Sequence, residues 1–511
     1  MGNENSKRIA KNALALYIRM LFTMGASLYA SRVVLKTLGV NDFGIYNVIN
    51  SFVAMFSMMT ATLTTSTQRF LSYELGKKQI NKAADVFSVS LNIHILLSVV
   101  VVIMIESIGL WFLNAKMSIP AQRLHAANWV LQLSAAAFVV NLLSVPYNAA
   151  IIANEKMDVF AYIAILEVGL KLLSLVFLVK AHSDRLIAYS ALILSVAVLI
   201  RIVYGICCRE LFPECKYKRV KSKSVYKDIL SVSGWNFLGS SASIATGEGI
   251  GLMLNLYGGG VIVNAAKGIA NQVQNAIQQL VGNFMMSINP QITKSYAASN
   301  LSYMDSLVDR GSRLSFYLLA LVAFPILLET NQLLSLWLNV VPPYATEFVR
   351  GVLLYLLLYP FSTLLDQVLM ASGKIRNSQI VISIFQFLNL PVAYLVLISK
   401  LPPYCIYYGI IIISLMCLGW RIYFACQWTG TTGLAYIRGT MVRSFVTIGV
   451  AVVIPIIFVV IIPPSVARLI FTFILTMGSI AISGYVIGID KQERTFFDEK
   501  IRHIVCKTKK I

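Results

Sequence analysis

The chain has 511 residues, of which 58% are hydrophobic and 13% are charged. Soluble domains carry roughly a quarter charged residues, so this composition excludes an ordinary soluble protein and indicates one that lies in a membrane. The formal net charge of +21 is explained by loop topology and by attraction to anionic lipid headgroups, and we therefore expect no nucleic-acid partner.

Apolar runs of about 20 residues, long enough to cross a ~30 Å hydrocarbon core as helices, recur along the whole chain. Fourteen spans are predicted, at residues 9–31, 43–66, 86–113, 125–152, 159–180, 186–208, 229–256, 261–288, 312–338, 345–371, 379–399, 404–425, 441–462 and 465–488. The connections are too short to hold a separate soluble domain. We therefore predict an all-α membrane protein that acts within the bilayer, and we do not expect an enzyme.

The basic residues predict the orientation, because positively charged loops stay in the cytoplasm. Most Lys and Arg residues fall in segments that are cytoplasmic if both termini are inside. The largest group lies in residues 209–228, RELFPECKYKRVKSKSVYKD, which carry seven basic residues in the middle of the chain. This stretch is predicted to be a cytoplasmic linker between two halves.

Two short stretches indicate an internal repeat. IIANEKMDVF at 151–160 and LMASGKIRNS at 369–378 both follow an even-numbered span, and Ala153 and Ala371 align at an offset of 218 residues. A parallel repeat of six helices places a pseudo-twofold axis along the membrane normal, with a central cavity between two lobes. The predicted parts are an N-terminal lobe (1–208), the linker (209–228), a C-terminal lobe (229–425), two extra spans (426–488) and a basic cytoplasmic tail (489–511).

Polar residues within spans are costly, so a polar face indicates contact with water, with a ligand or with another helix. Spans one, two, seven and eight carry such faces, and span eight has the longest, at helical steps of three and four. Arg19 lies about ten residues, or ~15 Å, from the start of span one, near the middle of the bilayer. The residues predicted to bind substrate in the cavity are Arg19, Asn47, Asn236, Asn264, Lys267, Asn271, Gln274 and Gln278. Packing between helices is the alternative.

Charged residues within the spans are predicted to be either structural or available to a ligand. Glu167 and Lys171, four residues apart, are predicted to form an ion pair on one helix. Arg421 is expected to extend to the membrane surface.

Arg19 and Lys267 either pair with Glu248 and Asp366 or stay available to an anionic ligand. In the second case the two acids are candidates for ion coupling.

The sequence offers little for catalysis. Its seven cysteines lack metal-ligand spacing, and the glycine-rich stretch LNLYGGGVIV lacks the Lys-Ser/Thr of a phosphate-binding loop. We expect no metal and no cofactor.

Two stretches near the N-terminus resemble a known family. They are SRVVLKTLGVNDFGIYNVINSF at 31–52 and QRFLSYELGKKQ at 68–79, and they are similar to the lipid-linked oligosaccharide and O-antigen flippases of the Wzx type. These flippases belong to the multidrug/oligosaccharidyl-lipid/polysaccharide exporter superfamily. The residues that carry the similarity are Leu38, Gly39, Phe43, Gly44, Tyr46, Arg69, Glu74, Leu75 and Gly76. In physical terms GVNDFG is a turn in which Gly39 permits a left-handed backbone.

The resemblance implies a transporter that flips polyprenyl-diphosphate-linked oligosaccharide units, precursors of lipopolysaccharide O-antigen, capsule or exopolysaccharide, by alternating access. The implied location is the bacterial inner membrane. The implied partners are an undecaprenyl-diphosphate-type lipid, membrane lipids and Na⁺ or H⁺. Two alternatives stay open. Lys267 and Arg19 argue against a drug/cation antiporter of the same superfamily, and the lack of a large outer loop argues against a glycan polymerase or ligase.

Overall fold

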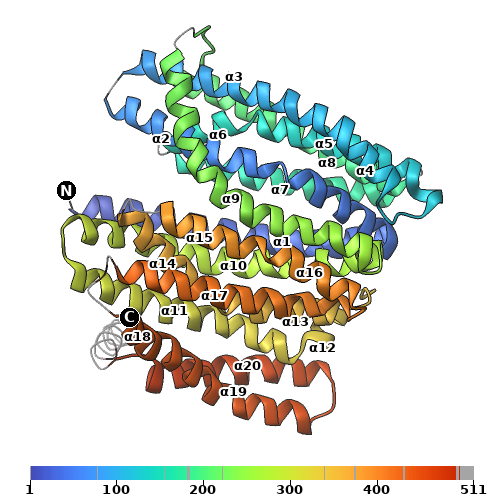
Figure 1. The fold of residues 1–511 in the computed structure, drawn as a ribbon, viewed down its shortest axis with the longest axis vertical. Helices are drawn as coiled ribbons and strands as arrows, with labels where there is room; N and C mark the ends of the chain where they lie inside the picture. Colours follow the sequence, from blue (N-terminus) through green and yellow to red (C-terminus); the bar gives the residue numbers. More distant parts are fainter. Residues whose placement is uncertain are drawn as a thin grey trace, which may run out of the picture. The chain divides into compact units, whose positions relative to one another are not determined.

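The computed structural model describes residues 2–490 and Arg494, apart from residues 78, 155, 181–183, 221–222, 339, 373–375, 428 and 430–431. Within the helices some side chains are not described, those of residues 2–22 and 228–240 among them. Every regular element in the described part of the chain is a helix (Figure 1). The all-α architecture predicted from the sequence is confirmed.

The chain forms two compact units, which are described one at a time. The first comprises Met1–Gln272, Leu338–Phe348 and Gln379–Ile413. The helices wholly within it are α1 (Gly2–Ala54), α2 (Ser57–Gly76), α3 (Ile80–Met104), α4 (Leu110–Ala115), α5 (Leu124–Leu142), α6 (Val145–Ala153), α7 (Met157–Lys180), α8 (Arg185–Leu211), α9 (Lys223–Tyr257) and α16 (Asn389–Ile398). A π-helix, η1 (Ile105–Gly109), continues α3 into α4.

The second unit comprises Val273–Trp337, Val349–Ser378 and Ser414–Ile511. The helices wholly within it are α11 (Leu301–Leu328), α12 (Thr330–Trp337), α14 (Tyr359–Ser372), α18 (Gly433–Tyr436), α19 (Arg443–Ile461) and α20 (Val466–Ser483), with the π-helices η5 (Ile437–Val442) and η6 (Gly484–Gly488). Four helices run from one unit into the other: α10 (Val261–Ala297), α13 (Ala345–Leu356), α15 (Arg376–Phe387) and α17 (Ile406–Cys426). These units divide the chain differently from the predicted lobes, which stay a prediction.

The first unit has two apolar cores. One gathers Leu71 of α2, Phe87 of α3 and Ile151 of α6, all fully buried. The other gathers Ile49 of α1 and Leu131 of α5. Burial of each such side chain contributes about 1.5–3 kcal/mol in water, whereas in a membrane close packing supplies most of the attraction.

In the second unit α11 packs against α14, α19 and α20. The rings of Phe316 and Phe361 lie 5.2 Å apart between α11 and α14. A buried ion pair fastens α20, because Arg468 Nη2 donates to Glu329 Oε2 over 2.7 Å and the two side chains are 9% and 1% exposed. Glu329 Oε1 also accepts a hydrogen bond from Thr472 at 3.0 Å.

Proline explains three breaks in the predicted spans. A proline cannot donate to the carbonyl four residues earlier, which weakens the helix at that point. Helices α11 and α19 continue through Pro325 and Pro455, whereas three other helices end. Leu142, Leu356 and Phe387 are the last residues of α5, α13 and α15. They stand four residues before Pro146, Pro360 and Pro391 respectively.

The first helix is broken by a glycine instead. At Gly39 the backbone has φ 79° and ψ 172°, a region that only glycine adopts readily. The turn predicted at this glycine is confirmed. It ends the first predicted span and starts the second, which α1 completes together with α2.

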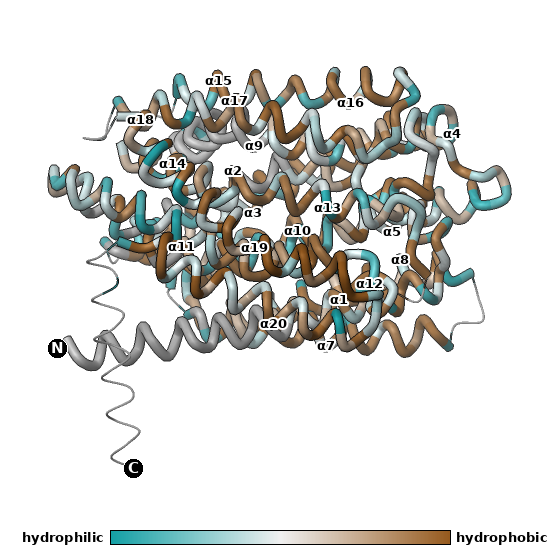
Figure 2. Tube along the Cα trace, turned by 90° about the horizontal axis from the view of Figure 1, so that it is seen from below, coloured by the Kyte–Doolittle hydropathy of each residue, from teal (hydrophilic) through white to brown (hydrophobic). Residues whose placement is uncertain are grey.

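Nine helical segments among the described residues are long and apolar enough to cross a membrane, or ten if the bent pair Ala345–Leu356 and Tyr359–Ser372 counts as one span. The four predicted spans outside this set are those of α1, α2, α9 and α10, which carry the polar faces. Figure 2 shows hydrophobic residues along α7, α15, α16 and α19. Exposed apolar side chains such as Phe177, Leu395 and Ile454 suit contact with lipid chains. Fourteen spans remain the prediction.

Candidate functional site

Helix α10 carries the longest polar stripe and begins after a turn of three glycines. Gly259 and Gly260 have positive φ values of 114° and 74°, which side chains other than glycine rarely adopt. The turn brings α10 back along α9, and Asn264 and Lys267 are only 2% and 6% exposed. The start of the stripe is therefore inside the first unit rather than on its surface.

Lys267 occupies a crevice made by glycine. Its Nζ donates to the carbonyl of Gly247 on α9 over 2.7 Å. A Cβ at Gly251 would lie 2.9 Å from this Nζ and 2.9 Å from Ser51 Oγ of α1. The absence of a side chain at position 251 therefore leaves room for the ammonium group among α1, α9 and α10.

The charge of Lys267 is compensated only in part. Glu248 lies near enough to attract it, but among the described residues no carboxylate comes within 4.0 Å of its ammonium group. A buried cation of this kind is costly unless it meets a counter-charge or water. Lys267 therefore stays a candidate for binding an anion, as predicted from the sequence.

The asparagines nearest to Lys267 serve partly as packing groups. Asn47 Nδ2 donates to the carbonyl of Phe43 over 2.7 Å, and its amide packs so closely on Gly268 that a Cβ there would lie 2.7 Å away. Asn264 Nδ2 donates to the carbonyl of Gly260 over 3.2 Å. One N–H donor of each amide is thus used locally, which leaves the other donor and the carbonyl oxygen for other partners.

The other predicted site residues fall into two groups. Asn271, Gln274 and Gln278 are half-buried further along α10. Arg19 and Asn236 belong to helices α1 and α9, but their side chains lie outside those that the structure describes.

Asp366 has a different partner from those considered in the sequence. Its Oδ1 accepts from Arg421 Nε over 2.8 Å, and the two side chains are 27% and 12% exposed. Arg421 was expected to extend to the membrane surface, and Asp366 was considered as a partner for Arg19 or Lys267. The structure corrects both points, because the fold brings α14 and α17 together and satisfies both charges in the second unit. The ion-coupling role of Asp366 stays a prediction.

The predicted ion pair on α7 is confirmed. Lys171 Nζ donates to Glu167 Oε1 over 2.6 Å. The four-residue spacing alone was enough to identify it.

A polar cavity that the sequence did not reveal lies in the first unit. It has a volume of about 200 Å³, and five of its lining residues are polar: Tyr46, Asn50, Ser134, Asn141 and Ser190. On α1, the feature of the sequence that indicates this cavity is a pair of polar residues four positions apart, Tyr46 and Asn50. The residues of α5 and α8 are isolated in apolar sequence, so only the fold brings them together.

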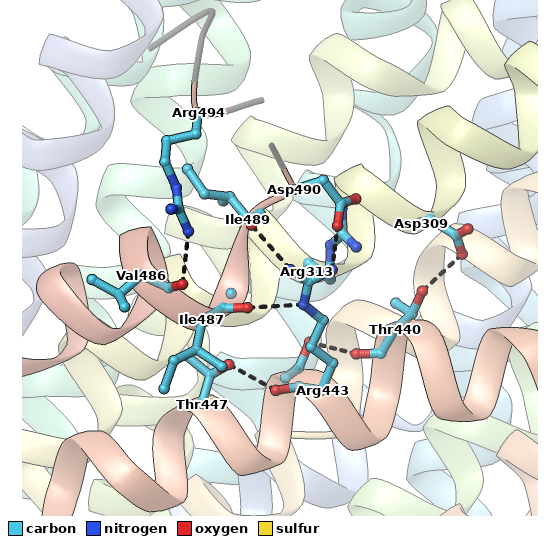
Figure 3. A network of polar contacts seen from close by, with 12 residues as sticks. Asp309, Arg313, Thr440, Arg443, Thr447, Val486, Ile487, Ile489, Asp490 and Arg494 are labelled. Carbon is cyan, nitrogen blue, oxygen red and sulfur yellow. Dashed lines mark hydrogen bonds and ion pairs between the residues drawn. The ribbon is translucent and has the colours of Figure 1, made fainter. Parts of the chain in front are cut away.

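A charged network in the second unit was also missed (Figure 3). Arg313 Nη2 donates to Asp490 Oδ2 over 2.9 Å, and Arg443 donates to the other oxygen of Asp490. Burial acts to raise the pKa of Asp490, but Arg443 and Arg313 bring that pKa below its usual value. Both arginines bond to the same carboxylate, and Arg443 Nε also donates to the carbonyl of Ile487, so we interpret the network as a structural link between α11, α19 and η6.

The described residues contain no group of three or more His, Cys, Asp or Glu side chains that could hold a metal ion. The six cysteines that the structure describes form no disulfides. The polar chemistry of this part of the chain thus consists of amides, hydroxyls, carboxylates and cations.

Comparison with solved structures identifies proteins of similar fold. The structure is similar to an inward-facing multidrug resistance MATE family transporter of the MOP superfamily, with a TM-score of 0.64 and 17% identity over 80% of this chain and 98% of that one. It is similar to the inward closed conformation of the lipid II flippase MurJ, with a TM-score of 0.66 and 11% identity over 93% of this chain and 98% of that one. The chain has the fold of MOP superfamily transporters.

A third MOP structure, from Pyrococcus furiosus, covers 83% of this chain and 96% of its own at a TM-score of 0.63 and 16% identity, and it is described as having a binding pocket of reverse polarity. In sequence, the chain is 20% identical over 336 residues to the uncharacterized membrane protein EpsK of Bacillus subtilis (strain 168). That match covers 64% of this chain and 64% of the length of EpsK, less than two thirds of either. No family model matches the chain.

Proposed function

We propose that the protein is a flippase that moves polyprenyl-diphosphate-linked oligosaccharides from the cytoplasmic to the outer leaflet of the bacterial inner membrane. The carried lipid is of the undecaprenyl-diphosphate type and serves O-antigen, capsule or exopolysaccharide synthesis. Both termini lie in the cytoplasm. No bond is made or broken.

The observation that carries this proposal is the extent of the match to a flippase. The lipid II flippase MurJ covers 93% of this chain, whereas the MATE structures cover 80 to 82%. A fold that accounts for about a tenth more of the chain favours a carrier of lipid-linked sugar over a carrier of drugs. The resemblance to Wzx-type flippases at residues 31–52 and 68–79 points the same way.

The chemistry of α10 supports an anionic, sugar-bearing substrate. A sugar headgroup and two phosphates lose their hydration on entering hydrocarbon, at a cost of several kcal/mol or more. The amides of Asn271, Gln274 and Gln278 replace hydrogen bonds to sugar hydroxyls, and Lys267 and Arg19 attract the phosphates. The polyprenyl chain stays in the bilayer during this movement.

The membrane potential assists the outward step. A negative charge that leaves a negative cytoplasm gains roughly 2.3 kcal/mol per 100 mV. An ion gradient of Na⁺ or H⁺ adds to this driving force if Glu248 or Asp366 binds the ion in one conformation only.

A reconstitution experiment tests the proposal. The full chain is placed in liposomes with a polyprenyl-diphosphate-linked oligosaccharide that carries a fluorescent sugar, and an impermeant quencher reports the fraction in the outer leaflet. We expect outward movement well above that of protein-free liposomes. Transport of a cationic dye is measured in parallel liposomes with an ion gradient, as the test of the alternative function, a drug/cation antiporter. Dye transport without movement of the lipid would replace the flippase by a drug/cation antiporter.

A further inference from the structure

A charged cavity, separate from the polar one described above, lies in the first unit, away from the α10 stripe in sequence. It has a volume of about 630 Å³, within the range of pockets that hold small ligands. Its described lining residues are Tyr29, Arg32, Val33, Lys36, Thr37, Val179 and Arg185. They come from α1, from the last turn of α7 and from the first residue of α8.

Five of these residues share one face of α1. Positions 29, 32, 33, 36 and 37 follow helical steps of three and four, and this face ends just before the break at Gly39. Arg185 Nη1 donates to the carbonyl of Thr37 over 3.3 Å and so joins the start of α8 to α1. The cavity is therefore built from three helices, two of which, α1 and α8, are joined by a hydrogen bond.

The described lining of the cavity carries three cations and no acid. The acids nearby in the chain, Asp42 and Asp184, are both held by Arg123. Its Nε and Nη2 donate to Asp42 over 2.8 Å and 2.6 Å, and its Nη1 and Nη2 donate to Asp184 over 2.6 Å and 3.0 Å.

The hydrogen bonds from Arg123 hold the pKa of Asp184 below its usual value, so this carboxylate stays charged at neutral pH. Arg123 offsets the charge of one of these two carboxylates, so the three groups together keep one negative charge, which is less than the three positive charges of the described cavity lining. Arg32, Lys36 and Arg185 together give it a surplus of positive charge.

The position of the cavity fits a lipid headgroup. Tyr29 is 58% exposed and stands one helical turn from Arg32, and tyrosine with arginine or lysine at the end of a span is typical of the membrane–water interface. The distribution of Lys and Arg predicts that the part of α1 just before Gly39 lies on the outer side of the membrane, where basic residues are less frequent. Three basic residues around one cavity on that side are therefore best explained by an anionic ligand.

We propose that this cavity binds the phosphate groups of a lipid at the interface. Arginine forks and a lysine suit a phosphate or diphosphate, because the guanidinium groups bind two oxygens at once and the ammonium adds charge. Two lipids offer this chemistry: a polyprenyl diphosphate and an anionic phospholipid. The assignment of this site to the carried lipid rests on the proposed flippase function. The proposal that the cavity binds lipid phosphate groups is independent of that function.

The test measures binding rather than transport. The full chain in nanodiscs of zwitterionic lipid is titrated with a polyprenyl diphosphate, with phosphatidylglycerol and with inorganic pyrophosphate. The variant is Arg32→Gln/Lys36→Gln/Arg185→Gln, and the matched control is Lys116→Gln, another exposed cation next to a predicted outer loop. We expect the triple variant to bind the polyprenyl diphosphate about tenfold more weakly, with a smaller dependence on salt, and the control to match the wild type.

The outcomes separate the two lipids. A loss confined to the polyprenyl diphosphate assigns the site to the carried lipid, and an equal loss for phosphatidylglycerol assigns it to membrane headgroups. Unchanged affinity for both lipids in a folded triple variant overturns the proposal. If the triple variant does not fold, the single Lys36→Gln variant, with an exposed side chain, is measured in its place.

The same experiment distinguishes a failure of this site from a failure of the proposed function. Binding to the outer cavity is therefore also measured in a Lys267→Met background, in which the proposed α10 site does not contribute, and flipping by the wild type is measured separately. If the wild type binds the lipid here but does not flip it, the flippase proposal fails while the binding site stands.

Discussion

Lys267 and Asp366 show how differently two charges within predicted spans are accommodated. Lys267 is 6% exposed and bonds to the carbonyl of Gly247, without an ion pair among the described residues. Asp366 has a full partner in Arg421. A charge with incomplete compensation is a better candidate for ligand binding than one that is satisfied by the fold.

Replacement of Lys267 by methionine tests this assignment, because methionine keeps the volume and removes the charge. We expect Lys267→Met to lower lipid flipping about tenfold or more while the amount of protein in the membrane stays normal. Flipping is measured with the quenching assay and protein by blotting. The control is Lys267→Met/Glu248→Gln, because full recovery of flipping in it would reduce Lys267 to the structural partner of Glu248.

Loss of the Asp366 carboxylate is expected to act on stability. Asp366→Asn leaves Arg421 without its partner, at a cost of about 2 kcal/mol after allowance for the exposure of both groups. The melting temperature of the purified protein should fall in Asp366→Asn and in Arg421→Gln, and by less than the sum in the double variant. An unchanged melting temperature together with lost ion dependence of transport would assign Asp366 to ion coupling instead.

Local charge pairs could be predicted from the sequence and distant ones could not. Glu167 and Lys171 are four residues apart, so one helix turn fixes their contact. Asp366 and Arg421 are 55 residues apart, and only the packing of α14 on α17 decides that they meet. The same holds for Arg123, which bonds to residues 81 and 61 positions away.

At the scale of secondary-structure elements, the hydrophobic pattern predicted most of the helices, whereas the positions at which helices break depend on individual prolines and glycines. The apolar runs gave the spans, but the ends of α5, α13 and α15 are set by prolines four residues downstream. Hydropathy averages over such breaks, because a break does not change the composition of a span. Glycine contacts are likewise invisible in a hydropathy profile.

Gly44 marks the tightest approach between elements in the first unit. A Cβ at this position would lie 1.8 Å from the carbonyl oxygen of Val261 at the start of α10, so Gly44→Ala must move one of the two helices. We expect a loss of more than about 3 kcal/mol, seen as aggregation after detergent extraction or as a strongly lowered melting temperature.

Gly25→Ala is the matched control for this substitution. Gly25 lies on the same helix, and a Cβ added there would meet nothing within 4 Å. Alanine also favours a helix over glycine by up to about 1 kcal/mol. Equal behaviour of the two variants would show that α1 and α10 do not touch at Gly44.

At the scale of the whole molecule, the distribution of Lys and Arg predicts that both termini are cytoplasmic. Single cysteines at Ser183 and Ser222, in a chain whose seven native cysteines are replaced, test this orientation. Both positions lie outside the described residues. An impermeant thiol reagent added to intact cells should label the cysteine at 183, whereas the one at 222 should react only after permeabilisation. The reverse pattern would invert the topology.

The ion pair of Arg468 and Glu329 has a consequence for biosynthesis. The two residues are 139 positions apart, so Glu329 emerges from the ribosome and enters the membrane long before Arg468 does. Arg468 is the third residue of α20, so as a lone cation it costs less than the about 3 kcal/mol of an arginine at the centre of a span, and the carboxylate already in place offsets this cost. We therefore expect a chain that lacks Glu329 to insert its final hairpin less efficiently than the wild type.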